Sequence, residues 1–260
     1  MTDNRPIAFF DSGVGGLTVF AKVKKLLPNE NYLYFGDTKN MPYGEKSEKQ
    51  LIEFADRIFK FFEKQNAKAV VMACNTTSAI TYEKLKDNYN FKIYPIIQTV
   101  CSTLAGLDGV KSLGVIATPA TINSHAYSKG IAKYNKDMKV YELAAPNWVR
   151  IVEEHRIHQP QSIEQIKEIL EVMKENNPDK IVLACTHYPY LLDVLKNFLP
   201  EDKYIDPAIF FAQSIKNDLE KNNLLGKEPT YERFYVSSDP ENFKIASELF
   251  YKLDILPELV

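Results

Sequence analysis

Short apolar runs alternate with longer amphipathic segments along the chain. The short runs are rich in β-branched and aromatic residues and predict buried strands at residues 7–10, 32–35, 69–73, 93–97, 113–117, 140–143 and 180–184. The segments between them place apolar residues on one helical face and predict helices at residues 16–27, 47–65, 76–87, 121–134 and 163–174. This alternation indicates an α/β fold with parallel sheets covered by helices on both faces.

Polar residues mark several helix starts. Ser47 and Gln50 have the spacing of a capping box, and Ser162 and Gln165 repeat that spacing before another predicted helix. Asp239-Pro240 suits the N-cap and first helical position of the last helix. We therefore expect these helices to begin at or just after the polar residues.

Part of the sequence recurs. Residues 70–76 (VVMACNT) resemble residues 181–187 (IVLACTH), which places Cys74 and Cys185 111 residues apart at the same point of the motif. Residues 7–13 have a looser counterpart in residues 113–119. Two related α/β halves of about 110 residues, followed by a C-terminal remainder, fit the length of the chain.

The composition excludes several classes of protein. The chain carries 32 Lys and Arg against 34 Asp and Glu, a formal net charge of −2, which gives no electrostatic basis for binding nucleic acid or an anionic membrane. We see no apolar run of the roughly 18 residues that a membrane span needs, and no signal-peptide core. Three cysteines without a C-x-x-C pair argue against a disulfide framework and a Cys-rich zinc site. We expect a cytoplasmic protein that holds no metal.

Five of the predicted strands are followed within two residues by a polar or reactive residue. Ligands of open α/β sheets bind at the carboxyl ends of the strands, which is where this pattern places Asp11, Asp37, Cys74, Thr118 and Cys185. We therefore expect the functional site at these strand ends.

The cysteines are not equivalent. Cys74 stands just before a predicted helix, where a thiol can have its pKa lowered toward neutrality, and Cys185 has a similar setting. A lone cysteine more often packs as a small apolar residue. Two at matching strand ends favour a function, whereas Cys101 has no counterpart and is expected to be structural.

Other candidates are less specific. The loop at residues 11–16 (DSGVGG) could hold an anion on its backbone N–H groups, or it could be only a tight turn. His187 could act as an acid or base beside Cys185. His155 and His158 have a possible metal-ligand spacing without a third ligand, so a solvated helix end is expected. The adjacent Glu153-Glu154 would by default be an exposed pair.

Two thiols that face one ligand from opposite sides suit a particular chemistry. Inverting a carbon centre needs a base that removes a proton from one face and an acid that returns one to the other. Equivalent residues from two related halves supply such a pair.

Four motifs together make the chain resemble the aspartate/glutamate racemase family: residues 11–16 (DSGVGG), 42–44 (PYG), 73–76 (ACNT) and 185–189 (CTHYP). The resemblance implies cofactor-independent interconversion of L- and D-glutamate, supplying D-glutamate for peptidoglycan. It also implies two similar parallel-sheet α/β domains related by pseudo-twofold symmetry, with the active site in the cleft between them, and a homodimer. The first domain would comprise residues 1–97 completed by 207–260, and the second residues 98–206.

The resemblance also implies residue roles. Cys74 would deprotonate D-glutamate with help from Asp11, and Cys185 would deprotonate L-glutamate with help from His187. Glu153 would assist the substrate amino group or His187, although Arg150 stands where the family usually has proline. The implied substrate-binding residues are Asp11, Ser12, Asp37, Pro42, Tyr43, Gly44, Asn75, Thr76, Thr118, Thr121, Thr186 and His187.

Three alternatives stay open. Aspartate racemases share the two-thiol logic but usually carry Cys-Thr-Glu at the second motif, so Cys185-Thr186-His187 favours glutamate. A cysteine hydrolase or transferase would use one thiol as a nucleophile. A non-enzymatic binding module would hold a small dicarboxylate without exchanging its α-proton.

Overall fold

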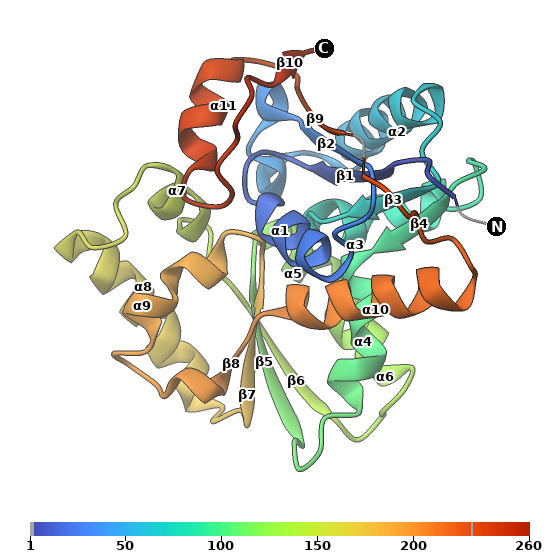
Figure 1. Ribbon diagram of the computed structural model, residues 1–260. Helices are drawn as coiled ribbons and strands as arrows, with labels where there is room; N and C mark the ends of the chain where they lie inside the picture. Colours follow the sequence, from blue (N-terminus) through green and yellow to red (C-terminus); the bar gives the residue numbers. More distant parts are fainter. Residues whose placement is uncertain (1–2, 230) are drawn as a thin grey trace.

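The strands form two sheets in which all neighbouring strands run parallel. The computed structural model describes residues 3–229 and 231–260, and within them the sheets have the orders β10-β9-β2-β1-β3-β4 and β6-β5-β7-β8 (Figure 1). The strands are β1 (Ile7–Asp11), β2 (Tyr32–Gly36), β3 (Ala69–Met72), β4 (Lys92–Pro95), β5 (Ser112–Ala117), β6 (Lys139–Ala144), β7 (Lys180–Ala184), β8 (Tyr204–Ile205), β9 (Glu232–Val236) and β10 (Glu258–Leu259).

Helices connect and cover the strands. The α-helices are α1 (Leu17–Leu26), α2 (Glu48–Lys64), α3 (Asn75–Leu85), α4 (Ile96–Ala105), α5 (Pro119–Ser124), α6 (Ala126–Ala132), α7 (Trp148–Glu153), α8 (Pro160–Glu175), α9 (Leu192–Leu195), α10 (Pro207–Lys221) and α11 (Pro240–Ser247). Short 3₁₀ turns are η1 (Thr38–Asn40), η2 (Tyr43–Glu45), η3 (Tyr188–Leu191) and η4 (Glu201–Lys203).

The two sheets repeat one strand order. The run β2-β1-β3-β4 matches β6-β5-β7-β8, so β1 corresponds to β5 and β3 to β7. Cys74 and Cys185 accordingly follow equivalent strands, as the recurring motif predicts. The predicted fold class, two similar parallel-sheet α/β halves, is confirmed. β9 and β10 of the C-terminal segment extend the first sheet, which is compatible with the predicted domain boundaries; those boundaries stay a prediction.

The largest apolar cluster lies between the two sheets. It joins Phe9 on β1 to Val115 on β5, with Phe211 on α10 in the same cluster, and Figure 1 shows α1 and α10 crossing between the sheets. Because neighbouring side chains on a strand point to opposite faces, Phe10 packs instead under α2 and Ile116 under α8. Both faces of each sheet are therefore buried, which explains the continuous apolar runs in the sequence.

The predicted helix starts are correct at one capping box and wrong at the other. The Ser47 hydroxyl accepts from the backbone N–H of Gln50, and the side-chain oxygen of Gln50 accepts from the backbone N–H of Ser47, as predicted. The box predicted at Ser162 does not form, because α8 begins earlier at Pro160. The φ angle of proline suits the first helical position, and Pro160 takes that position in α8. Ser162 is therefore already inside the helix, where it is buried, and cannot act as the N-cap.

Two predicted elements are divided. The strand predicted at 93–97 ends at Pro95, which becomes the N-cap of α4. The helix predicted at 121–134 is interrupted at His125, which has a left-handed φ of 55° and separates α5 from α6. Asp239 caps α11 as predicted, with its carboxylate accepting from the backbone N–H of Asn242.

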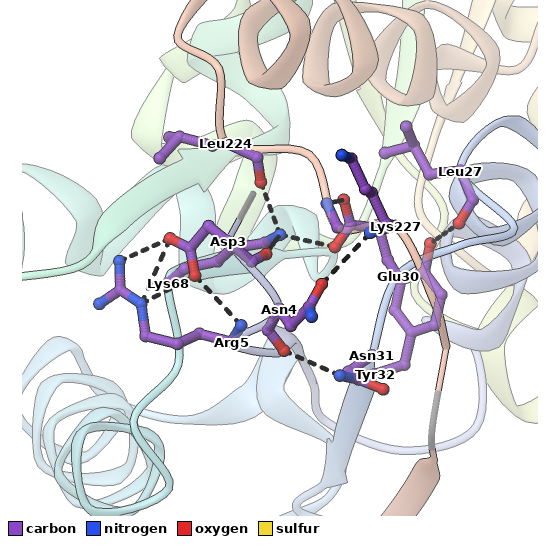
Figure 2. A network of polar contacts seen from close by, with 11 residues as sticks. Asp3, Asn4, Arg5, Leu27, Glu30, Asn31, Tyr32, Lys68, Leu224 and Lys227 are labelled. Atoms are coloured by element: carbon purple, nitrogen blue, oxygen red, sulfur yellow. Dashed lines mark hydrogen bonds and ion pairs between the residues drawn. The ribbon is translucent and has the colours of Figure 1, made fainter. Parts of the chain in front are cut away.

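A buried ion pair fastens the C-terminal segment to the first sheet (Figure 2). Lys68 precedes β3, and its fully buried Nζ donates at 2.6 Å to Glu30 Oε2 and to the carbonyl oxygens of Asp3 and Leu224. The other oxygen of Glu30 accepts from the backbone N–H of Gly226 at 2.7 Å. All three protons of the ammonium group thus have acceptors, and the chain that leaves α10 is held beside the amino end of β3.

We expect Lys68→Met to destabilise the protein strongly, because it leaves the Glu30 carboxylate buried without its partner. The expected loss in the free energy of unfolding, measured by urea denaturation, is about 3–5 kcal/mol. Lys60→Met is the control: Lys60 also lies 2.6 Å from a carboxylate, that of Asp56, but is 63% exposed and should cost less than about 1 kcal/mol. Equal losses in the two variants would contradict this account.

Candidate functional site

The facing carboxyl ends of the two sheets enclose a small cavity. Its volume of about 30 Å³ gives room for only about one or two water molecules. Its lining comes from the segments that follow β1, β2, β3, β5 and β7, including η2 and the start of α3, and from α7. Most of the predicted site residues line it: Ser12, Pro42, Tyr43, Gly44, Cys74, Asn75, Thr76, Thr118, Glu153, Cys185, Thr186 and His187.

Cys74 caps the start of α3 with its backbone rather than its thiol. Its carbonyl oxygen accepts from the Thr77 hydroxyl at 3.0 Å, and the residue, which lines the cavity, is 7% exposed. Burial, together with the negative charge of Asp11, raises the pKa of the Cys74 thiol to about 12 and outweighs the lowering effect of the Thr77 N–H. The prediction that the helix start would lower this pKa is therefore wrong for the closed cavity.

Asp11 lies just behind the cavity wall and does not line it. It is fully buried at the end of β1; one oxygen accepts from the Gly13 N–H at 3.0 Å and the other from the Thr186 hydroxyl at 3.5 Å. Burial raises the pKa of Asp11 to about 6, although the positive charge of His187 opposes the shift. The carboxyl group is therefore still mostly ionised at neutral pH, but its pKa lies much closer to neutrality than that of an ordinary aspartate.

The second thiol has different neighbours. Cys185 Sγ lies 3.8 Å from His187 Nδ1, and His187 Nε2 lies 2.7 Å from Glu153 Oε1. Burial alone would lower the pKa of His187, but its contacts with Cys185 and Glu153 prevail and hold it well above its ordinary value. Glu153 is only 22% exposed, so the expectation of an exposed pair is wrong for it, while Glu154 binds Arg156 at the surface.

The glycine-rich loop after β1 brings the two halves together. A Cβ on Gly15 would lie 2.4 Å from His187 Cε1 and 2.5 Å from the Thr186 hydroxyl oxygen, and one on Gly16 would lie 2.4 Å from Asp11 Cβ. These distances are far inside van der Waals contact, so Gly15 permits the close approach of the Thr186 and His187 side chains, and Gly16 that of Asp11. Within this loop Ser12 lines the cavity, while Gly15 and Gly16 provide a close contact that the sequence did not predict.

Three hydroxyl groups form a cluster where α3 meets α5. Thr118 Oγ1 lies 3.0 Å from both Thr76 Oγ1 and Thr121 Oγ1, and Thr76 and Thr121 are 3.4 Å apart. Thr121 does not line the cavity and reaches it only through the other two. Because hydroxyl protons rotate freely, this cluster can turn donors toward an anion in the cavity.

Asp37 was predicted to bind substrate but does not line the cavity. Its carboxylate is fully buried and fully engaged: it accepts from the Asn40 side-chain amide at 2.9 and 3.0 Å, from Arg57 Nη2 at 3.1 Å and from the Tyr43 hydroxyl at 2.5 Å. These partners make Asp37 a support for Tyr43, which does line the cavity.

Sequence reasoning missed Met41 and Val149, which also line the cavity. Met41 directly precedes the Pro42 motif, but an apolar side chain in a loop carries no chemical signal.

His155 and His158 lie exposed in the turn after α7, as expected for a solvated helix end. In the described part of the chain, no group of three or more His, Cys, Asp or Glu residues could hold a metal ion, and no helix is long and apolar enough to cross a membrane.

Comparisons with known proteins agree with this geometry. The sequence profile of the Asp/Glu/Hydantoin racemase family matches residues 16–215. The chain is 39% identical over 249 residues to a glutamate racemase of Thermoanaerobacter pseudethanolicus, covering 95% of this chain and 93% of that protein. Its structure matches the Francisella tularensis glutamate racemase, solved in complex with D-glutamate, with a TM-score of 0.90 at 35% identity over 99% of this chain and 98% of the other. A Picrophilus torridus aspartate racemase shares the fold, with a TM-score of 0.61 at 19% identity over 83% of this chain and 93% of that one.

The fold and site define a two-part α/β protein whose matching strand ends present two thiols to one closed cavity. The chain belongs to the Asp/Glu/Hydantoin racemase family. The resemblance predicted from the sequence is thereby confirmed, and with it the class of enzyme, a racemase, which is an isomerase.

We expect His187 to stay protonated well above pH 6.5, with Glu153 as a cause. Nitrogen NMR of histidine-labelled protein should show both ring nitrogens protonated at neutral pH, and Glu153→Gln should lower the pKa. Since a raised pKa favours the charged ring in the folded protein, this interaction stabilises the fold fully below about pH 6.5, and the contribution is lost as pH rises through the raised value.

Glu154→Gln is the matched control, because Glu154 binds Arg156 rather than His187. It should leave the His187 titration unchanged. A His187 ring that is neutral at pH 7, or one that responds equally to both variants, would contradict this assignment.

Proposed function

We propose that this protein interconverts L- and D-glutamate without a cofactor, using Cys74 and Cys185 as the two acid–base groups. The observation that carries the proposal is that these thiols, from equivalent strand ends, line one cavity. It is supported by the glutamate racemases that the chain resembles, one of them solved with D-glutamate. The product would serve peptidoglycan synthesis in the cytoplasm.

The two thiols would exchange roles with the direction of the reaction. The thiolate of Cys74 takes the α-proton of D-glutamate while the Cys185 thiol delivers a proton to the opposite face, and L-glutamate reacts in reverse. A protonated His187 beside Cys185 stabilises negative charge on that sulfur. With a pKa of about 12, Cys74 holds its proton firmly in the closed cavity and is ready to act as the acid.

The α-proton of an amino acid is very weakly acidic, so the carbanion needs electrostatic stabilisation. Ser12, Thr76, Thr118 and Thr186 place hydroxyl donors in the wall around the thiols, where they can bind the substrate carboxylates. The small cavity has room for only about one or two water molecules, so little solvent screens these interactions. Glutamate is larger than the space enclosed, so the walls must move apart to admit it.

Three further parts of the proposal come from the family resemblance. His187 after Cys185-Thr186 favours glutamate over aspartate as the substrate. The division into residues 1–97 with 207–260 and residues 98–206 is supported by β9 and β10 lying in the first sheet. A homodimer is proposed as the assembly, and sedimentation of the purified protein tests it.

The test is incubation of the purified protein with L- or D-glutamate in D₂O without added cofactor. We expect the circular dichroism of either enantiomer to decay to zero with deuterium incorporated at Cα. Cys74→Ser and Cys185→Ser should each lower the rate by more than about 10²-fold, because each direction needs both groups.

Cys101→Ser is the control, since Cys101 is buried on α4 outside the cavity lining, and its turnover should stay close to that of the wild type. Glutamate binding without Cα exchange would instead favour a binding module. A trapped acyl-enzyme with retained activity of Cys185→Ser would favour a hydrolase or transferase.

A further inference from the structure

A hydrogen bond crosses between the two halves beside the cavity. Tyr127 on α6 is fully buried, and its hydroxyl donates to Asn75 Oδ1 at 2.7 Å. Asn75 is the first residue of α3, is 3% exposed and lines the cavity, whereas Tyr127 does not. The tyrosine therefore reaches the site only through the asparagine.

The other end of the Asn75 amide has no partner. In the described part of the chain, three buried side-chain polar atoms lack a hydrogen bond: Asn75 Nδ2, Trp148 Nε1 and Ser162 Oγ. Of these residues, Asn75 is the one that lines the cavity. A buried N–H without an acceptor is unfavourable, and a carboxylate bound in the cavity would remove that cost.

We propose that Tyr127 is a positioning residue: by donating to Oδ1 it holds the Asn75 amide with Nδ2 free to donate to a carboxylate of the substrate. The proposal rests on the proposed function, which supplies a dicarboxylate. An amide can present either its oxygen or its nitrogen, and an oxygen turned toward the cavity would repel a carboxylate. A hydroxyl that donates to Oδ1 selects the orientation that attracts one.

The surroundings keep Tyr127 a donor and fix its place. Burial holds the pKa of its hydroxyl well above the ordinary value, so it keeps its proton throughout the working pH range. Behind it, α6 packs closely on α4: a Cβ on Gly130 would lie 2.5 Å from Cys101 Sγ, and that sulfur lies 4.0 Å from the Tyr127 carbonyl oxygen. Cys101 thus belongs to the packing between α4 and α6 and does not contact the Tyr127 hydroxyl.

Tyr127→Phe tests the proposal because it removes only the hydroxyl. We expect the KM for both enantiomers of glutamate to rise about tenfold, the size of one lost hydrogen bond to a charged group, with kcat within about threefold of the wild type. In an Asn75→Ala background the same substitution should have no further effect on KM, because the amide through which Tyr127 acts on the substrate is absent.

Tyr32→Phe is the matched control. The Tyr32 hydroxyl is equally buried and donates to the Leu27 carbonyl oxygen at 2.6 Å, but it lies outside the cavity lining, so KM should not change. An unchanged KM in Tyr127→Phe, or additive effects in the Asn75→Ala background, would overturn the inference. If the wild type itself fails to exchange the α-proton, the proposed function fails first.

A measurement on the wild type keeps the proposal testable even if Tyr127→Phe does not fold. The side-chain NH₂ resonances of Asn75 should shift in nitrogen–proton spectra when D-glutamate is added. Resonances that stay in place at saturating D-glutamate would overturn the assignment of Nδ2 as a carboxylate donor.

Discussion

The close contact of Gly15 with Thr186 and His187 is the constraint around which the site is arranged. There is no room for a side chain between the Gly15 loop, which follows β1, and the Thr186 and His187 side chains, which follow β7. The backbone of the loop therefore lies directly against these two side chains. This contact brings the buried Asp11 within reach of the Thr186 hydroxyl and seats His187 beside Cys185. The acid–base groups of both halves thereby share one enclosed space.

Opposite ends of the first sheet have different tasks. Its carboxyl ends carry Asp11 and Cys74 toward the cavity, while its amino ends hold the Lys68–Glu30 pair that ties in the chain after α10. The polar groups at the two ends also differ: Asn75 Nδ2 in the cavity lining has no hydrogen-bond partner, whereas the Lys68 ammonium group has every proton engaged.

The sequence predicted most of the fold because both faces of each sheet are buried, which leaves unmistakable apolar runs such as that of β3. It also located the two thiols, since a repeated motif must lie at equivalent strand ends in a repeated fold. It failed where competing local signals decide the outcome. Pro160 overrode the capping spacing of Ser162, and the left-handed His125 broke a helix whose apolar spacing was continuous. The turning of Asp37 toward Arg57, and the support of Asn75 by Tyr127, depend on partners distant in sequence that no local pattern reveals.

The two thiols have unlike partners, a carboxyl group with a pKa of about 6 near Cys74 and an ion-paired imidazole beside Cys185. For an enzyme that interconverts enantiomers this asymmetry has a strict limit. Mirror-image substrates have equal free energy in water, so kcat/KM must be the same in both directions at every pH. The unlike partners can therefore give the two directions different kcat and KM values, but the ratio kcat/KM must stay equal. A change that impairs one thiol must accordingly slow both directions by the same factor when the substrate concentration is low.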